Sequence, residues 1–352
     1  MGNISRIGII ANPNSGKDIR RLVGYGSVCD NIEKTEIIKR ILIGLDAAGV
    51  DEILFMPDKY NFSSLAVEGL HKKDYYRLKD KIQNIEMSVL GTERDSIVAS
   101  QILNGIGTDC IIVLGGDGTS RACAMGCKNT PLMPISTGTN NVFPYRLEGT
   151  LAGFIAGIYS TRNLNKDKVL SKSKHLELYI NCKLTSIALV DLVIYDVPFI
   201  GTKALWEPEK IKYVAVTRAD IGNLGMSSIV SNFKTITKTD KYGMYCYLNG
   251  EKNRFTVKSA LAPGLLYDVP IKSYDYLNIG EKIKLEVESE NKWVTIALDG
   301  EREFEINLDK DIIEIELKMG EVFVLDPVEI LREAIKNSLL ISKIGNEFIN
   351  YD

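Results

Sequence analysis

The sequence is poor in the residues on which many enzyme sites depend. Its 352 residues include only two histidines, His71 and His175, so we do not expect histidine to be central to the chemistry. No Gly-x-Ser-x-Gly motif, the nucleophile turn of serine hydrolases, is present. The six cysteines are scattered without a Cys-x-x-Cys pair, and no histidine or further cysteine stands near Cys123 and Cys127 to complete a zinc site. We therefore expect reduced, mostly buried thiols in a cytoplasmic protein.

Charge and hydropathy argue against nucleic acid or a membrane as partner, so we expect the protein to bind a small molecule. The sequence has 43 Lys and Arg against 46 Asp and Glu, a net charge of −3, which gives no electrostatic reason to expect nucleic acid or an anionic membrane. The longest apolar stretch, 184–200, is interrupted by Asp191, Asp196 and Pro198, so it predicts consecutive strands and no stable membrane insertion. Formation of a homo-oligomer stays open.

The first part of the chain alternates between helical and strand patterns. Residues 33–48 carry an apolar stripe at helical spacing, and residues 94–103 and 120–127 are also expected to be helical. Strands are expected at 7–10, 52–56, 86–90, 110–114 and 131–133. Strands that alternate with helices predict an α/β fold with a parallel, Rossmann-like sheet covered on both faces, over residues 1–165.

The pattern changes after about residue 165. Residues 175–180, 282–287 and 313–318 alternate apolar and polar side chains, and Asn-Gly at 249–250 and Asp-Gly at 299–300 are typical hairpin turns. We expect an antiparallel β-sandwich over residues 166–325, with the active site in the cleft between the domains. A helix at 327–344, within a C-terminal segment 326–352, is expected to pack back on the first domain.

The most informative motif is Gly115-Gly116-Asp117-Gly118-Thr119, which directly follows the apolar run 110–114. In open α/β sheets ligands bind at the carboxyl ends of strands, where glycines let the backbone approach a phosphate group and present N–H groups to it. Asp117 would stand beside the phosphates and their Mg²⁺. The dinucleotide pattern G-x-G-x-x-G fails, because Arg121 occupies its last position.

Two other loops follow predicted strands in the same way. Asn12, Ser15 and Gly16 lie in the turn after strand 7–10. After the strand at 131–133 comes a turn of small polar residues with Thr137, Gly138, Thr139 and Asn140. Both loops are compatible with a nucleotide on the same edge of the sheet as the glycine loop.

These motifs, in this order, resemble the superfamily of NAD kinases and diacylglycerol or sphingosine kinases. The resemblance rests on Asn-Pro-x-Ser-Gly at 12–16, Gly-Gly-Asp-Gly-Thr at 115–119, the Gly/Thr/Asn turn and a late Asp-Gly-Glu at 299–301, and it covers roughly residues 5–325. The opening of the chain is most similar to ATP-NAD kinase-like proteins of the acetoin-catabolism X type. The resemblance implies the two-domain NAD kinase/diacylglycerol kinase fold, with ATP and Mg²⁺ as cofactors.

The resemblance also implies roles for individual residues. The residues implied to bind the nucleotide are Asn12, Ser15, Gly16, Gly115, Gly116, Gly118, Thr119, Thr137, Gly138, Thr139 and Asn140. Asp117 would hold Mg²⁺ through water or act as the base. In the lipid-kinase branch the base is instead the acid of the late motif, here Asp299, with Glu301 supporting the metal network.

Two departures keep the alternatives open. Lipid kinases carry an acid in the third loop where this chain has an amide, Asn140 or Asn141. NAD kinases follow their glycine loop with an Asn-Glu pair that holds the acceptor ribose, and none is suitably placed in 120–160. In addition, Asp299-Gly300 lies between two strand patterns, so it is also a hairpin turn with a purely structural explanation.

The sequence therefore favours an ATP-dependent kinase, a phosphotransferase that acts on a hydroxyl of a small molecule, with an NAD-like dinucleotide as the favoured acceptor. The alternatives are a lipid or sphingoid-base kinase and a non-catalytic protein that binds a nucleotide for regulation. An NAD-dependent oxidoreductase is disfavoured by the failed dinucleotide pattern.

Overall fold

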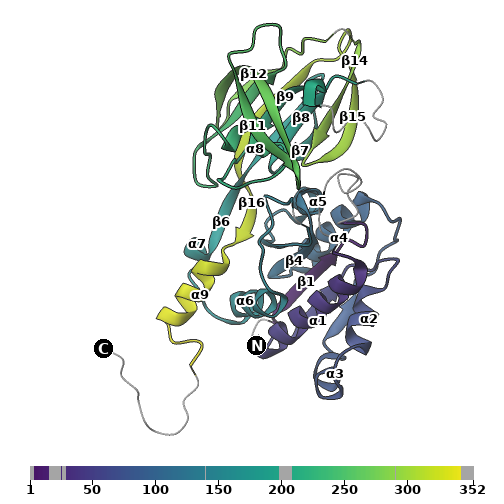
Figure 1. The fold of residues 1–352 in the computed structure, drawn as a ribbon. Helices are drawn as coiled ribbons and strands as arrows, with labels where there is room; N and C mark the ends of the chain where they lie inside the picture. The colour runs from purple at the N-terminus through teal and green to yellow at the C-terminus, as the bar shows by residue number, and fades with distance from the viewer. Residues whose placement is uncertain are drawn as a thin grey trace.

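A computed structural model describes residues 4–15, 25, 29–138, 140–197, 208–289 and 291–341, with the side chains of 301–303 left out. The described chain forms a lower domain of strands and helices and an upper domain made mostly of strands, with two long strands running between them (Figure 1). This arrangement confirms the predicted α/β domain followed by an antiparallel sandwich.

The lower domain is a twisted sheet with helices on both faces. Its parallel strands lie in the order β3-β2-β1-β4-β5. Their bounds are β1 Arg6–Ala11, β2 Glu52–Phe55, β3 Ile82–Asn84, β4 Cys110–Gly115 and β5 Leu132–Ser136. The helices are α1 Asn31–Ala48, α2 Phe62–Glu68, α3 Lys72–Leu78, α4 Glu93–Ile106, α5 Asp117–Cys127, α6 Gly149–Thr161, α7 Lys166–Val169 and α9 Pro327–Lys336.

The alternation of side chains along β4 explains why the sheet has two covered faces. Cys110, Ile112 and Leu114 belong to the core that α1 and α6 complete, whereas Ile111 and Val113 belong to the core that α4 and α5 complete. Successive side chains of a strand point to opposite faces, so an unbroken apolar run is buried on both sides.

The upper domain is a sandwich of two sheets. Its own sheet has the order β11-β12-β10-β9-β8-β14-β15 and packs on β6, β7, β13 and β16 of the first sheet through a shared apolar core. The bounds are β6 Leu170–Ile180, β7 Lys183–Ala188, β8 Asp191–Tyr195, β9 Ile211–Val216, β10 Tyr242–Leu248, β11 Phe255–Ala262, β12 Leu265–Asn278, β13 Lys282–Lys284, β14 Trp293–Leu298, β15 Glu301–Asn307 and β16 Ile313–Leu325, with a short 3-10 turn at Pro208–Lys210 and the helix α8 Ser227–Ser231.

The two domains share one sheet. β16 pairs antiparallel with β6 along nearly its whole length, and near its end Val324 pairs in parallel with Leu132 of β5. Directly after β16, α9 packs against α6 and places Ile330 and Ala334 in the core of the lower domain. The predicted boundary at 325 is thus the last residue of β16, and the boundary at 165 precedes α7, the short helix that leads into β6.

Several local predictions were wrong. Residues 86–90 form no strand, and the edge strand β3 lies earlier, at 82–84. α9 ends at Lys336, and the end of the predicted helix falls partly outside the described residues. Asn249-Gly250 does not join a paired hairpin, because β10 pairs with β12 rather than with β11.

None of the helices in the described ranges is long and apolar enough to cross a membrane.

Candidate active site

The three predicted loops meet at the carboxyl ends of three neighbouring strands, β1, β4 and β5. The Asn12 amide donates to Thr119 Oγ1 at 3.1 Å, which ties the first loop to the glycine loop. The hydroxyls of Ser15 and Thr137 lie 3.4 Å apart, and the Thr137 N–H donates to the Gly115 carbonyl at 3.2 Å. Segments more than 100 residues apart in sequence thus form one continuous polar rim.

A lysine that the sequence analysis missed holds the first loop in place. Lys34 of α1 is fully buried, and its Nζ donates to the carbonyls of Asn12 and Ser15 at 3.0 and 2.6 Å and to Asn31 Oδ1 at 3.1 Å. A buried ammonium is stable only when such acceptors surround it. Lys34 lies four residues before Ile38, on the apolar stripe of the predicted helix, and this position could have identified it as a buried lysine.

The glycines of the loops allow close packing around Asn141. A Cβ on Gly116 would lie 2.9 Å from Asn141 Oδ1, and one on Gly138 would lie 3.2 Å from Asn141 Nδ2. A Cβ on Gly115 would lie 2.5 Å from the Cβ of Thr119.

Gly116 is also the N-cap of α5, whose first turn contains Asp117 and the buried Gly118. The N-terminus of a helix favours anions, because its first N–H groups and its dipole both attract negative charge.

Asp117 connects the glycine loop to the third loop. Its Oδ1 accepts hydrogen bonds from the backbone N–H groups of Val142 and Phe143 at 3.1 and 2.8 Å, and the carboxylate is only half-buried. In the same loop, Asn140 Oδ1 is buried and has no hydrogen-bond partner among the described residues. A half-exposed carboxylate and an unpaired amide oxygen are both suitable ligands for Mg²⁺.

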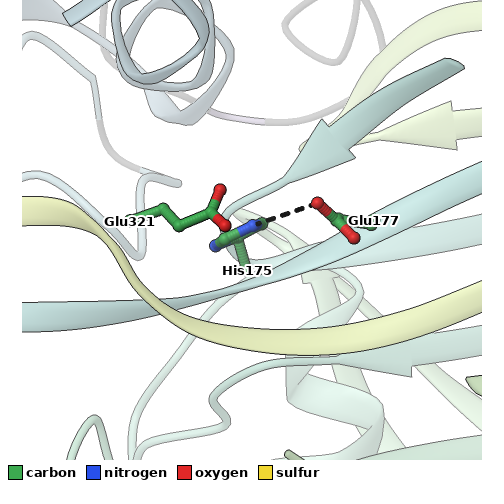
Figure 2. Close-up of side chains that lie close together, drawn as sticks. All are labelled: His175, Glu177 and Glu321. Carbon is green, nitrogen blue, oxygen red and sulfur yellow. Dashed lines mark ion pairs between the residues drawn. The ribbon is translucent and has the colours of Figure 1, made fainter. Parts of the chain in front are cut away.

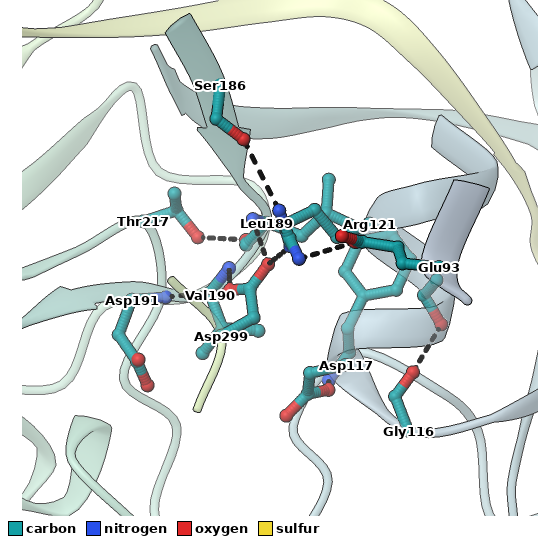
Figure 3. A network of polar contacts seen from close by, with 12 residues as sticks. Glu93, Gly116, Asp117, Arg121, Ser186, Leu189, Val190, Asp191, Thr217 and Asp299 are labelled. Atoms are coloured by element: carbon teal, nitrogen blue, oxygen red, sulfur yellow. Dashed lines mark hydrogen bonds and ion pairs between the residues drawn. The ribbon is translucent and has the colours of Figure 1, made fainter. Parts of the chain in front are cut away.

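Asp299 lies in a different environment (Figure 3). Its side chain is 0% exposed, and the carboxylate accepts from the N–H groups of Leu189, Val190 and Asp191 at 2.8, 2.7 and 3.1 Å. Burial raises the pKa of Asp299, while Arg121 and the three N–H groups oppose that shift. The carboxylate turns toward Arg121, whereas that of Asp117 turns away from it. Asp299 also has a φ of 51°, as the predicted hairpin turn requires.

Two buried arginines behind the loops were not predicted as site residues. Arg121 of α5 donates to Glu93 and Ser186 at 2.5 and 3.3 Å and lies 3.8 Å from Asp299, so it joins the two domains. It stands at the position that breaks the dinucleotide pattern. Arg218 lies over the ring of Phe143 at 4.9 Å, and burial lowers its pKa. No motif surrounds Arg218 that could have identified it.

A cavity of about 340 Å³ adjoins the first loop. Asn12 lines this cavity and also contacts Thr119, so the cavity lies beside the glycine loop. Its wall includes polar and aromatic groups from the ends of β1 and β2 and from the start of α4, namely Asn12, Asn14, Asp58, Lys59, Tyr60 and Asp95.

Three of the predicted site residues cannot be placed. Gly16 and Thr139 lie outside the described residues, and so does the side chain of Glu301, whose backbone begins β15. The remaining nucleotide-binding candidates all lie on the rim formed by the three loops.

The comparisons with known proteins agree with this architecture. Residues 7–145 match the model of the ATP-NAD kinase N-terminal domain, and residues 174–319 match that of the acetoin catabolism protein X C-terminal domain. Acetoin catabolism protein X of Cupriavidus necator is 31% identical over 312 residues, which cover 87% of this chain and 86% of the relative.

Two solved structures share the fold. Yeast NADH kinase, crystallised with NADH, superposes with a TM-score of 0.53 at 11% identity over 99% of this chain and 91% of its own. A diacylglycerol kinase-like protein from Bacillus anthracis superposes with a TM-score of 0.50 at 15% identity, over 93% and 100% of the two chains. At these identities the likeness concerns the fold alone. Together, the two domain matches and the full-length relative show that this chain belongs to the acetoin catabolism protein X family, which has the fold of NAD kinases and diacylglycerol kinases.

Proposed function

We propose that this protein is an ATP-dependent kinase that transfers a phosphoryl group to a hydroxyl of a small molecule, with an NAD-like dinucleotide as the favoured acceptor. The observation that carries the proposal is the convergence of three loops at the ends of β1, β4 and β5, with the N-terminus of α5 at their centre. This is the position at which open α/β sheets bind nucleotides.

The cavity beside the first loop is a suitable place for the base and ribose of ATP. Its volume of about 340 Å³ is at the lower end of the range of small-molecule sites, and its wall combines the Tyr60 ring with amide and charged groups. A nucleoside there would direct its phosphates past Asn12 toward Thr119 and the first turn of α5, where N–H groups favour negative charge.

Phosphoryl transfer depends mainly on positioning and on neutralisation of charge, so few residues suffice. We assign to Asp117 the role of holding Mg²⁺, directly or through water, with Asn140 Oδ1 as a second oxygen on the same edge. Bound there, Mg²⁺ would neutralise charge on the transferred phosphate. Arg218 would add fixed positive charge behind the third loop.

The two candidate bases differ in their access to a substrate. Asp299 is completely buried and already accepts three backbone N–H groups, whereas Asp117 is half-exposed on the rim. If a side chain acts as the base on the acceptor hydroxyl, we therefore favour Asp117 over Asp299, as an alternative to its role in direct coordination of Mg²⁺, since a carboxylate bound directly to the ion cannot also take the proton. This assignment follows the NAD-kinase branch of the superfamily and supports a dinucleotide acceptor over a lipid.

The first test is calorimetric titration of ATP and Mg²⁺ into the protein, followed by NAD and NADH. Binding of both ligands and formation of a phosphorylated dinucleotide would support the proposal. Binding of ATP together with phosphorylation of a lipid in mixed micelles would establish the lipid-kinase alternative. Nucleotide binding with no turnover on either class would favour a regulatory protein, and lack of ATP binding would refute the proposed site.

Replacement of Asp117 tests the assignment of the acid. Asp117→Asn keeps an Oδ1 that can accept from Val142 and Phe143, so the thermal midpoint should stay near that of the parent protein, while turnover should fall by about 100-fold or more. The control is Asp74→Asn, which changes an acid in the first turn of α3. Equal turnover of the two variants would exclude the role of Asp117.

A further inference from the structure

Three side chains outside the candidate active site form a group with the composition of a metal site (Figure 2). His175 and Glu177 lie on β6, and Glu321 lies on β16. One ring nitrogen of His175 and one carboxylate oxygen from each glutamate all lie within 4.8 Å of one another. In Figure 2 the imidazole lies between the two carboxylates.

The backbone explains how Glu321 reaches this group. β6 and β16 are antiparallel, with His175 opposite Lys318 and Glu177 opposite Glu316. The register then shifts between Met319 and Val322, and Gly320 adopts a φ of 106°, which favours glycine. Such a bulge re-aims the side chains of a strand. Here it places Glu321 beside a histidine that the regular ladder pairs with Lys318.

The imidazole is buried with part of its hydrogen-bonding capacity unused. His175 is 1% exposed, and its Nδ1 has no hydrogen-bond partner among the described residues. Its Nε2 lies 3.9 Å from Glu177 Oε1, beyond hydrogen-bonding distance. Buried polar nitrogens without partners are unfavourable, and a cation would give a partner to whichever ring nitrogen faces the two glutamates.

The surrounding charges favour a cation. The Tyr179 hydroxyl donates to Glu177 Oε2 at 2.7 Å and so orients the other oxygen of that carboxylate toward the histidine. Hydrogen bonds such as the one from Tyr179 orient ligands at known metal sites. Nearby, Lys318 and Lys282 both form ion pairs with Glu316. The two lysines thus pair mainly with Glu316, although Lys318 also lies near Glu177 and Glu321, and the two glutamates together bring two negative charges to the histidine.

We infer that His175, Glu177 and Glu321 bind a divalent transition-metal ion of the Zn²⁺ class, which links β6 to β16 where these strands pass between the domains. The imidazole favours such an ion over Mg²⁺ or Ca²⁺, which prefer oxygen ligands. Nitrogen and oxygen ligands lie about 2.0–2.2 Å from Zn²⁺, so the three atoms draw closer on binding. Glu321 is exposed on the bulge and is free to make that movement.

The experiment measures binding of Zn²⁺, and of Co²⁺ as a spectroscopic probe, to the full chain without nucleotide or Mg²⁺. We expect one site whose occupation raises Tm. Glu321→Gln should weaken binding by at least about 10-fold and reduce the rise in Tm at the same metal concentration. Glu314→Gln, which removes one negative charge from the same strand, should bind like the parent protein.

Because Glu321 is exposed, Glu321→Gln is expected to fold, and its Tm without metal verifies this. Equal affinities of the parent protein and Glu321→Gln would overturn the inference, since the ion would then bind elsewhere, for example at the exposed Cys182. Lack of Zn²⁺ binding by the parent protein would overturn it as well. The assay contains no ATP, so its outcome is independent of the proposed kinase activity.

Discussion

Arg121 is the residue through which the glycine loop meets the second domain. Arg121 lies one turn after Asp117 on α5, and its side chain is 1% exposed. It contacts Glu93 of α4, Ser186 of β7 and Asp299 of the hairpin turn. A buried cation with a buried carboxylate beside it is costly to break, because the remaining charge loses its partner. The Arg121 and Asp299 pair therefore ties the position of the helix to the fold of the sandwich.

Replacement of Asp299 distinguishes this structural role from that of a base. Asp299→Asn should lower the free energy of unfolding by about 2–4 kcal/mol, because the amide removes the charge opposite Arg121 and cannot accept all three N–H groups. Asparagine tolerates the positive φ, so the turn itself is kept. Urea unfolding measures the change, with the exposed Asp268→Asn as a control expected to cost under about 1 kcal/mol. A fully stable Asp299→Asn that loses only turnover would restore Asp299 as the base.

At the scale of residues, the sequence predicts the position of the polar loops better than it predicts which side chains are buried and what they contact. The three polar loops could be found because each follows a strand and carries small polar residues. The burial of Asp299 could not be found, because its partners Leu189 to Asp191 lie about 110 residues earlier in the chain. The same holds for Arg218, whose partners Ser173 and Phe143 lie 45 and 75 residues earlier in the chain.

At the scale of elements, the crossing of α1 and α6 depends on glycine. Gly149, Gly153 and Gly157 recur every four residues on α6 and face α1, whose own Gly44 faces α6. A Cβ on Gly153 would lie 2.1 Å from the Ile41 carbonyl oxygen. The sequence analysis named no helix over these residues, and glycine has a low helix propensity. In this helix, close packing against α1 compensates for that propensity.

Two glycine-to-alanine variants separate packing from propensity. Gly153→Ala should destabilise the protein by about 1–3 kcal/mol, because α1 and α6 must move apart to admit the methyl group. Gly105→Ala on α4 has nothing within 4 Å of the new Cβ, so it should be neutral or stabilise by up to about 1 kcal/mol. Thermal and urea unfolding measure both. Stabilisation by Gly153→Ala would contradict the tight crossing.

At the scale of the whole molecule, one sheet continues through both domains. The alternating patterns of β6 and β16 predicted strands correctly, but periodicity alone does not say which strands pair. The contact of Val324 with Leu132 joins residues almost 200 positions apart. The sequence therefore predicted two domains of the right classes, while the continuity between them emerges only from the fold.

This continuity predicts that the two domains unfold together, and the cysteines provide a probe in each. Burial raises the pKa of Cys123, in the lower domain, and of Cys246, in the sandwich, to about 12, so neither thiol should react in the native protein near pH 8. The exposed Cys182 should react at once and serves as the internal control. Pulsed alkylation at increasing urea, read by mass spectrometry of each peptide, should give Cys123 and Cys246 the same midpoint. Separate midpoints would mean that β6, β16 and α9 do not couple the domains, and that the sandwich folds as a unit of its own.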